Sequence, residues 1–124
     1  MKESALLRQS KDYLGWLRNQ GFLWFSRLNS GEINYDDRYG RHHHIELCEE
    51  GTADFVIMAG NLRTHRSPVV IFWETKAKGK KLTGKQSEFS CQVCQFGALY
   101  YFGDKLETLV GALQEINPGI PKPE

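Results

Sequence analysis

The sequence has no long hydrophobic run, and this absence limits what the chain can be. No stretch approaches the roughly 20 uninterrupted apolar residues of a membrane-spanning helix, and the first residues lack the apolar core of a signal peptide. There are three cysteines, an odd number in a chain without a secretion signal, so a disulfide framework is not expected. We therefore expect a cytoplasmic protein with reduced thiols and no membrane partner.

A strong net charge is also missing. The formal charge is +1 at pH 7, which gives no bulk argument for a polyanionic partner. The charges are unevenly distributed, however, because Glu74 is the only acid between Asn61 and Lys85. Such a basic run is most often a solvated turn, but here it could face phosphate groups. Its basic residues are Arg63, Arg66, Lys76, Lys78, Lys80, Lys81 and Lys85.

The residues that are present indicate one α/β domain. The 124 residues, 40% of them hydrophobic, are enough for one compact core. Apolar periodicity predicts helices over residues 3–20, 84–96 and 104–116, and strands over 22–28, 53–58, 69–77 and 98–102. This order is typical of a mixed β-sheet flanked by helices.

Pairing and helix boundaries follow from the same pattern. Strands 53–58 and 69–77 should pair antiparallel through a connection at 59–68, whereas 69–77 and 98–102 should be parallel because a helix joins them. Thr83 with Gln86, and Asp104 with Glu107, have the form of capping boxes. The polar stretch 32–50 is interpreted as a loop with a short strand at 44–47. The tail from Asn117 holds three prolines and is expected to fray.

Two carboxylates and a lysine stand where predicted strands end. Glu74 and Lys76 are two residues apart and project from the same face of a strand. Asp54 begins the neighbouring strand, so antiparallel pairing would bring it close to Glu74. Adjacent carboxylates repel each other, and a hard cation such as Mg²⁺ would neutralise them. A bare Glu-x-Lys, however, is more often a surface ion pair.

The wider pattern resembles a known family. Gly51-Thr-Ala-Asp54 is followed by an apolar run into Glu74-Thr-Lys76, a lysine–glycine turn and Gln86 in a capped helix. Near the N-terminus, Glu3 opens a helix and Arg27-Leu-Asn-Ser-Gly31 follows the first strand. Over roughly residues 3–115 this resembles the virus-type replication-repair nucleases of the PD-(D/E)XK superfamily. The sequence departs from the family at Ala53, where proline often stands, and in the long insertion 32–50.

This resemblance implies a fold, a cofactor and residue roles. The fold would be the restriction-endonuclease-like core, a mixed β-sheet flanked by helices. The cofactor would be Mg²⁺, with Mn²⁺ as a substitute, bound by Asp54, Glu74 and the backbone carbonyl of Thr75. Lys76 would be the catalytic lysine, and Gln86 and Glu3 would complete the site. We expect phosphate contacts from Lys78, Lys80, Lys81, Lys85, Arg27 and Asn29.

The implied partner is branched DNA. Short family members without attached domains look like phage proteins, and the implied activity is Holliday-junction cleavage. A four-way junction has near-twofold symmetry, so two symmetric subunits would most simply supply two cuts, and a homodimer is expected. Aromatic residues are candidates for its interface: Trp16, Trp24, Phe25, Tyr100 and Tyr101.

Other interpretations stay open. A non-catalytic DNA-binding module would use the lysines without the acids, and a nuclease for flaps or other branches would use the same centre. A zinc-stabilised domain could use Cys48, Cys91 and Cys94, although two cysteines inside a predicted helix favour core positions. The run Arg41-His42-His43-His44 could contact phosphate or metal, although loop histidines are more often solvated.

Overall fold

The computed structural model describes residues 2–29, 31–60 and 68–124. Arg63 and Arg66 of the basic run, and most of the connection at 59–68, lie outside the described residues. None of the helices in the described part is long and apolar enough to cross a membrane. The elements in chain order are α1 (Glu3–Asn19), β1 (Leu23–Arg27), β2 (Glu32–Asp36), β3 (His42–Glu46), β4 (Phe55–Ala59), β5 (Val69–Thr75), α2 (Gly84–Gln95), β6 (Leu99–Gly103) and α3 (Leu106–Ile116).

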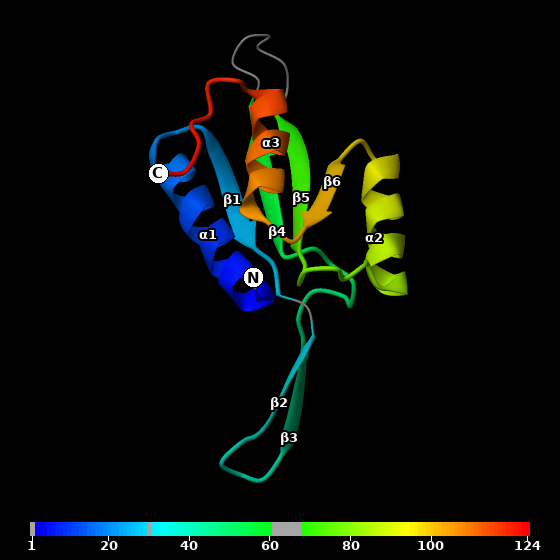
Figure 1. Cartoon of the computed structure of the whole chain (residues 1–124). Coiled ribbons are helices and arrows are strands. Elements are labelled where there is room, and N and C mark those ends of the chain that lie inside the picture. The colour runs from blue at the N-terminus through cyan, green and yellow to red at the C-terminus, as the bar shows by residue number, and fades with distance from the viewer. Residues whose placement is uncertain (1, 30, 61–67) are drawn as a thin grey trace.

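Four strands form a mixed sheet in the order β1-β4-β5-β6. β4 runs antiparallel to both β1 and β5, and β6 runs parallel to β5. The predicted antiparallel and parallel pairings are therefore confirmed, as is a mixed sheet with helices around it. Figure 1 shows α1 and α3 lying against the sheet, with α2 beside β6.

The hydrophobic core lies between the sheet and the pair α1 and α3. Alternate residues of the central strands point into it, and Phe55, Ile57, Ile71 and Trp73 are fully buried. The Trp73 indole N–H donates to the hydroxyl oxygen of Ser10 in α1 at 2.9 Å, so this buried polar pair is satisfied. This contact fixes α1 across the strand that carries Glu74.

The opposite face of the sheet is only partly covered. Phe89 of α2 packs edge-on against Phe72 of β5 and Tyr100 of β6. Beyond α2, Trp24 of β1 and Met58 of β4 lie opposite each other in the register and remain 50% and 41% exposed. The β1–β4 side of this face therefore stays open to solvent in the described chain.

The prediction of a loop over residues 32–50 is wrong, because most of this segment is a β-hairpin. β2 and β3 pair antiparallel, with Ile33 opposite Ile45 and Tyr35 opposite His43. The hairpin strands contain few apolar residues, so the alternating pattern that predicts a strand is weak. The short strand predicted at 44–47 overlaps only part of β3. All ten strand positions are exposed or half-exposed, so core burial does not order them.

The C-terminal expectations also need correction. α3 begins at Leu106 after Lys105, without a side-chain cap, so Asp104 and Glu107 form no capping box. The sequence predicts a frayed tail, but Ile120 is 1% exposed. In addition, the Tyr13 hydroxyl donates to the carbonyl of Pro121 at 2.8 Å. The apolar Ile120 thus holds the tail against the core.

The structure also differs from two sequence-based predictions, the burial of the cysteines and the exposure of the candidate interface aromatics. Cys91 and Cys94 are exposed rather than core residues, because α2 covers only one margin of the sheet and buries none of its own residues. Phe25 is a core residue, and Trp16 and Tyr101 pack against the core. Trp24 is therefore the most exposed of the candidate interface aromatics.

Candidate active site

Three adjoining strand ends bring the predicted site residues together. β1 ends at Arg27, β4 begins just after Asp54, and β5 ends at Glu74 and Thr75. The register pairs Phe55 with Trp73, so the two residues just outside this pair, Asp54 and Glu74, become neighbours. The backbone N–H of Leu28 donates to the Asp54 carbonyl at 2.8 Å, which continues the β1–β4 ladder. Regular backbone pairing therefore positions the site.

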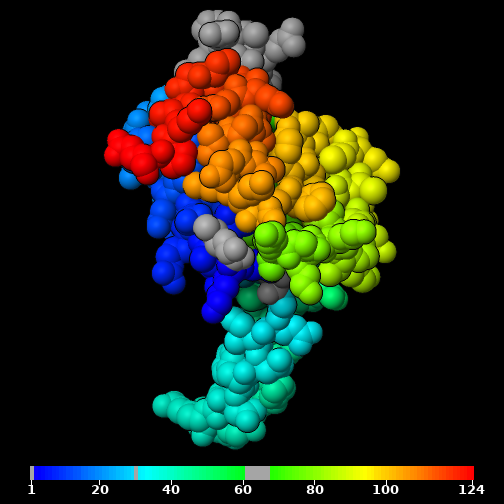
Figure 2. Space-filling model, in the orientation of Figure 1, coloured from blue at the N-terminus to red at the C-terminus, as the bar shows by residue number. Residues whose placement is uncertain are grey.

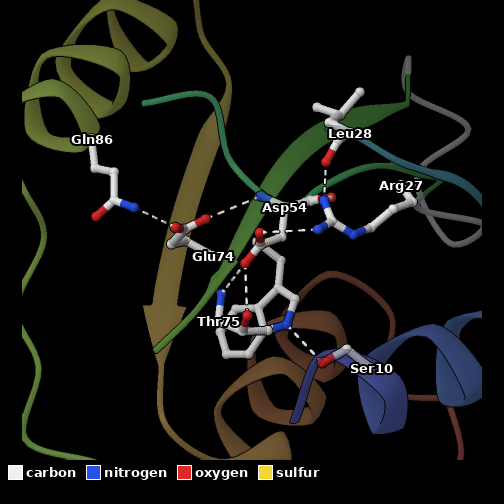
Figure 3. Close-up of polar contacts among 8 residues, drawn as sticks. Ser10, Arg27, Leu28, Asp54, Glu74, Thr75 and Gln86 are labelled. Atoms are coloured by element: carbon white, nitrogen blue, oxygen red, sulfur yellow. Dashed lines mark hydrogen bonds and ion pairs between the residues drawn. The ribbon is translucent and has the colours of Figure 1, made fainter. Parts of the chain in front are cut away.

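Asp54 and Glu74 are linked through backbone and hydroxyl donors (Figure 3). The backbone N–H and the hydroxyl of Thr75 donate to Asp54 Oδ2 at 2.8 Å and 2.7 Å. The backbone N–H of Asp54 donates to Glu74 Oε2 at 3.1 Å. The two carboxyl groups thus belong to one hydrogen-bonded cluster, and the prediction that they lie close together is confirmed.

Gln86 connects this cluster to α2. Thr83 and Gln86 form the predicted capping box, in which the Gln86 amide oxygen accepts from the Thr83 backbone N–H at 2.9 Å. The amide nitrogen of the same side chain donates to Glu74 Oε1 at 2.6 Å. One side chain therefore both starts the helix and orients the carboxyl group of Glu74.

A close backbone approach fixes the loop before Asp54. Gly51 has φ +93°, and a Cβ atom there would lie 2.4 Å from the carbonyl oxygen of Lys85. Only glycine permits this contact. The Gly51 turn therefore packs against the first turn of α2, next to Gln86.

Burial dominates the electrostatics of the cluster. Glu74 and Lys76 are 3% and 8% exposed. The pKa of Glu74 is raised from its ordinary value of 4.5 to about 8, first by burial and then by the charge of Asp54, while the charge of Lys76 opposes the shift. Glu74 therefore keeps its proton near neutral pH unless a cation compensates its charge.

Arg27 also belongs to this cluster, although the sequence predicted that it contacts DNA phosphates. Its guanidinium lies 3.6 Å from Asp54 Oδ1 and donates to the backbone carbonyls of Leu28 and Asp54. These contacts hold it at the strand ends rather than free in solvent. Within the described residues, Arg27 forms the ion pair with Asp54 and so compensates its negative charge.

Tyr100 is a second residue that sequence reasoning did not place here. Its hydroxyl is buried without a hydrogen-bond partner among the described residues. Tyr100 pairs with Phe72, two residues before Glu74 along β5. Burial raises the pKa of Tyr100, and the charges of Glu74 and Asp54 raise it further. An orphaned buried hydroxyl costs about 1–3 kcal/mol, so a water or ligand oxygen at this position would be stabilised.

The remaining predicted residues lie outside the hydrogen-bonded cluster. Glu3 is exposed in the first turn of α1, and no hydrogen bond joins it to Asp54 or Glu74, all of which are described. The side chain of Asn29 is exposed, and its backbone carbonyl accepts from the Cys48 N–H at 2.8 Å. The lysines of the β5–α2 connection and the start of α2 are all exposed: Lys78, Lys80, Lys81 and Lys85.

The donor set suits a hard cation only in part. In the described ranges, no three His, Cys, Asp or Glu side chains are grouped to hold a metal. Mg²⁺, however, is commonly bound by one or two carboxylates and keeps several waters. Two carboxyl groups whose proximity raises the pKa of Glu74 therefore fit this ion, provided that Arg27 moves away from Asp54.

Comparison of the chain with protein-family models and with curated proteins found no match.

Proposed function

We propose that this chain is a Mg²⁺-dependent endonuclease that hydrolyses DNA phosphodiester bonds, similar to the virus-type replication-repair nucleases and their PD-(D/E)XK core. The supporting observation is the cluster at the strand ends. Asp54 and Glu74 share hydrogen bonds there, next to buried Lys76. Burial of an acid and a lysine beside a second, partly exposed acid opposes folding, and such arrangements are concentrated at functional sites.

Each residue has a role in this proposal. Asp54, Glu74 and the backbone carbonyl of Thr75 would hold the ion, and Mn²⁺ would substitute for Mg²⁺. When bound, the ion supplies a Lewis acid that stabilises charge developing on the phosphate. Lys76 orients the attacking water or stabilises the developing oxyanion. Gln86 holds Glu74 in position through its 2.6 Å hydrogen bond.

The exposed lysines favour DNA as the substrate and shape as the recognised feature. Lys78, Lys80, Lys81 and Lys85 lie on the segment that follows β5, close in sequence to Glu74 and Lys76. Contacts to phosphates position a protein on DNA without reading its sequence. We therefore propose branched DNA as the substrate, and a four-way junction cut by a homodimer as the specific case.

Cleavage assays with matched DNA test this function. The purified chain would be incubated with a four-way junction, a flap and a linear duplex in Mg²⁺, Mn²⁺ and EDTA. We expect cleavage of branched DNA with either metal and none in EDTA. Asp54→Asn should abolish cleavage, whereas Asp12→Asn, a change of the same kind at an exposed position of α1, should not.

Two results of the same assay would contradict the proposal. Binding of DNA without cleavage in every metal would favour a non-catalytic DNA-binding module. Normal turnover by Asp54→Asn would contradict the assignment of the catalytic centre to this carboxylate cluster. Cleavage restricted to flaps would support the proposed catalytic centre but show that flaps, rather than four-way junctions, are the substrate.

A further inference from the structure

The β2–β3 hairpin projects from the body of the molecule (Figures 1 and 2). Its two ends are tied together where the Leu47 N–H donates to the Gly31 carbonyl at 3.0 Å and the Cys48 N–H donates to the Asn29 carbonyl at 2.8 Å. Asn29 follows β1 directly after Leu28, which pairs with Asp54. The hairpin therefore leaves the body at the end of the sheet that carries the carboxylate cluster.

The turn at the end of the hairpin is ordered by its own hydrogen bonds. We call residues 37–41 the hairpin tip. The carboxylate of Asp37 accepts from the backbone N–H groups of Tyr39 and Arg41, each at 2.9 Å. The same carboxylate pairs with the Arg41 guanidinium at 3.1 Å and with the His43 ring at 2.8 Å. The negative charge of Asp37 is thus compensated within the hairpin.

An aromatic ring and two guanidinium groups gather at this tip. The Cζ atoms of Arg38 and Arg41 lie 4.9 Å and 5.2 Å from the Tyr39 ring centroid. The Arg38 guanidinium also donates to the Tyr39 hydroxyl at 2.8 Å. Tyr39 is nevertheless 67% exposed, so a large part of its surface remains available. Aromatic rings and guanidinium planes stack on nucleobases, and guanidinium groups also bind phosphates.

We propose that the hairpin tip, through Tyr39, Arg38 and Arg41, binds unstacked bases and the adjoining phosphates at the branch point of the DNA. This inference rests on the proposed function and assigns branch recognition to a site separate from the carboxylate cluster. A continuous duplex buries its base faces, whereas a branch point can present them to a stacking side chain. The tip therefore distinguishes branched from linear DNA.

The charges along one face of the hairpin strands disfavour phosphate contacts there. Glu32, Asp36 and Glu46 lie on one face of the two strands, where phosphates would be repelled. Each strand has five residues and is about 17 Å long at ~3.4 Å per residue, so the tip reaches well beyond the strand ends that carry the cluster. The tip and the cluster can therefore engage separate parts of one junction.

Equilibrium binding of the full chain tests the proposal without requiring cleavage. Fluorescence anisotropy in EDTA would compare a four-way junction with a linear duplex of equal length. We expect the wild type to prefer the junction, and Tyr39→Ala to lose roughly tenfold in junction affinity with little change on the duplex. Tyr39→Phe, which keeps the ring, should retain the preference.

Tyr35→Ala is the matched control. Tyr35 is a half-exposed tyrosine of the same hairpin, stacked on His43 at 4.9 Å rather than placed at the tip. We expect this variant to keep the junction preference. Near-native circular dichroism and an unchanged mass by light scattering would show that the Tyr39→Ala defect does not come from unfolding or from loss of a protein partner.

Each contrary outcome has a separate meaning. Wild-type junction affinity in Tyr39→Ala would overturn the tip as the recognition site while leaving the nuclease proposal intact. Equal losses in Tyr39→Ala and Tyr35→Ala, or a change in molecular mass, would overturn it in favour of a general or protein-binding role of the hairpin. A wild-type chain that binds no branched DNA would overturn both proposals.

Discussion

At the scale of single residues, Lys76 combines a charge with burial at the end of β5. It is 8% exposed, whereas Lys78, two residues later, is exposed. A lysine that only grips phosphate does not need burial, so the buried position favours a role beside the reacting groups.

The corresponding prediction compares these two lysines. Lys76→Ala should reduce single-turnover cleavage roughly 10²-fold or more while changing junction affinity less than about threefold, because the exposed lysines still contact phosphates. Lys78→Ala should keep the cleavage rate and weaken binding, with a smaller dependence on salt. Loss of affinity with normal cleavage in Lys76→Ala would reassign this residue to phosphate binding.

Glu74 makes the stability of the metal-free protein depend on pH. Its pKa is about 8 when folded and near 4.5 when unfolded, so the folded state binds more protons between these values. The free energy of unfolding therefore decreases as the pH rises from about 4.5 to 8.

Chemical denaturation of wild type and Glu74→Gln in EDTA would measure this effect. At pH 5 the two should differ little, and at pH 9 the glutamine variant should be more stable by an amount on the order of 3 kcal/mol. Added Mg²⁺ should stabilise the wild type more at pH 9 than at pH 6, because the ion competes with the proton. Parallel pH profiles for both proteins would contradict the raised pKa.

At the scale of elements, the Gly51 turn and α2 hold the site together through one backbone contact. A Cβ atom on Gly51 would lie 2.4 Å from the Lys85 carbonyl oxygen and 2.6 Å from its carbon, and φ is +93°. Neither atom belongs to a flexible side chain, so the loop or the helix must move if a side chain is added.

Gly51→Ala should therefore destabilise the protein by about 2–4 kcal/mol and lower cleavage. Gly79→Ala provides the control, because Gly79 also has a positive φ of +78° but no atoms within 4 Å of its Cβ position. Thermal unfolding of both variants would separate the close contact from the backbone strain. Equal shifts in Tm would show that strain alone accounts for the effect.

Local signals in the sequence predicted many elements and failed where the signal was ambiguous. Thr83 and Gln86 identified the start of α2, since both partners of the capping box are formed. The same pattern at Asp104 and Glu107 was misleading because α3 begins at Leu106 and therefore places neither side chain correctly for a box. The β2–β3 hairpin was missed because its sparse apolar residues meet no core.

The site was predictable to the extent that backbone pairing defines it. Alternation along β5 and antiparallel pairing with β4 were enough to place Asp54 beside Glu74. The positions of Arg27 and Tyr100 were not predictable in this way, because they depend on how β1 and β6 lie at the two margins of the sheet. Contacts of this kind arise from tertiary packing rather than from a local pattern.

At the scale of the whole molecule, the open β1–β4 side of one sheet face favours self-association. Trp24 and Met58 form an exposed apolar pair on neighbouring strands. Exposed apolar patches on a sheet often mark interfaces, and a twofold pairing of this face would bury it in both copies.

Light scattering would test this prediction. The wild type should have twice the chain mass of 14.3 kDa, and Trp24→Ser should shift the population toward the single-chain mass. Phe96→Ser is the control, because Phe96 is more exposed but lies at the end of α2, away from β1. A wild type that remains monomeric and cuts only flaps would refute the dimer while retaining the carboxylate cluster.

The double role of Gln86 connects the interior of the site to the surface of the molecule. Its amide oxygen holds the first turn of α2 and its amide nitrogen holds Glu74. A ligand that changes the charge or position of Glu74 must therefore alter the order of that helical turn, and by reciprocity the order of the turn alters the affinity for the ligand. Amide hydrogen exchange at Gln86 and Ser87, whose N–H groups are bound by Thr83, would report occupancy of the carboxylates from outside the site.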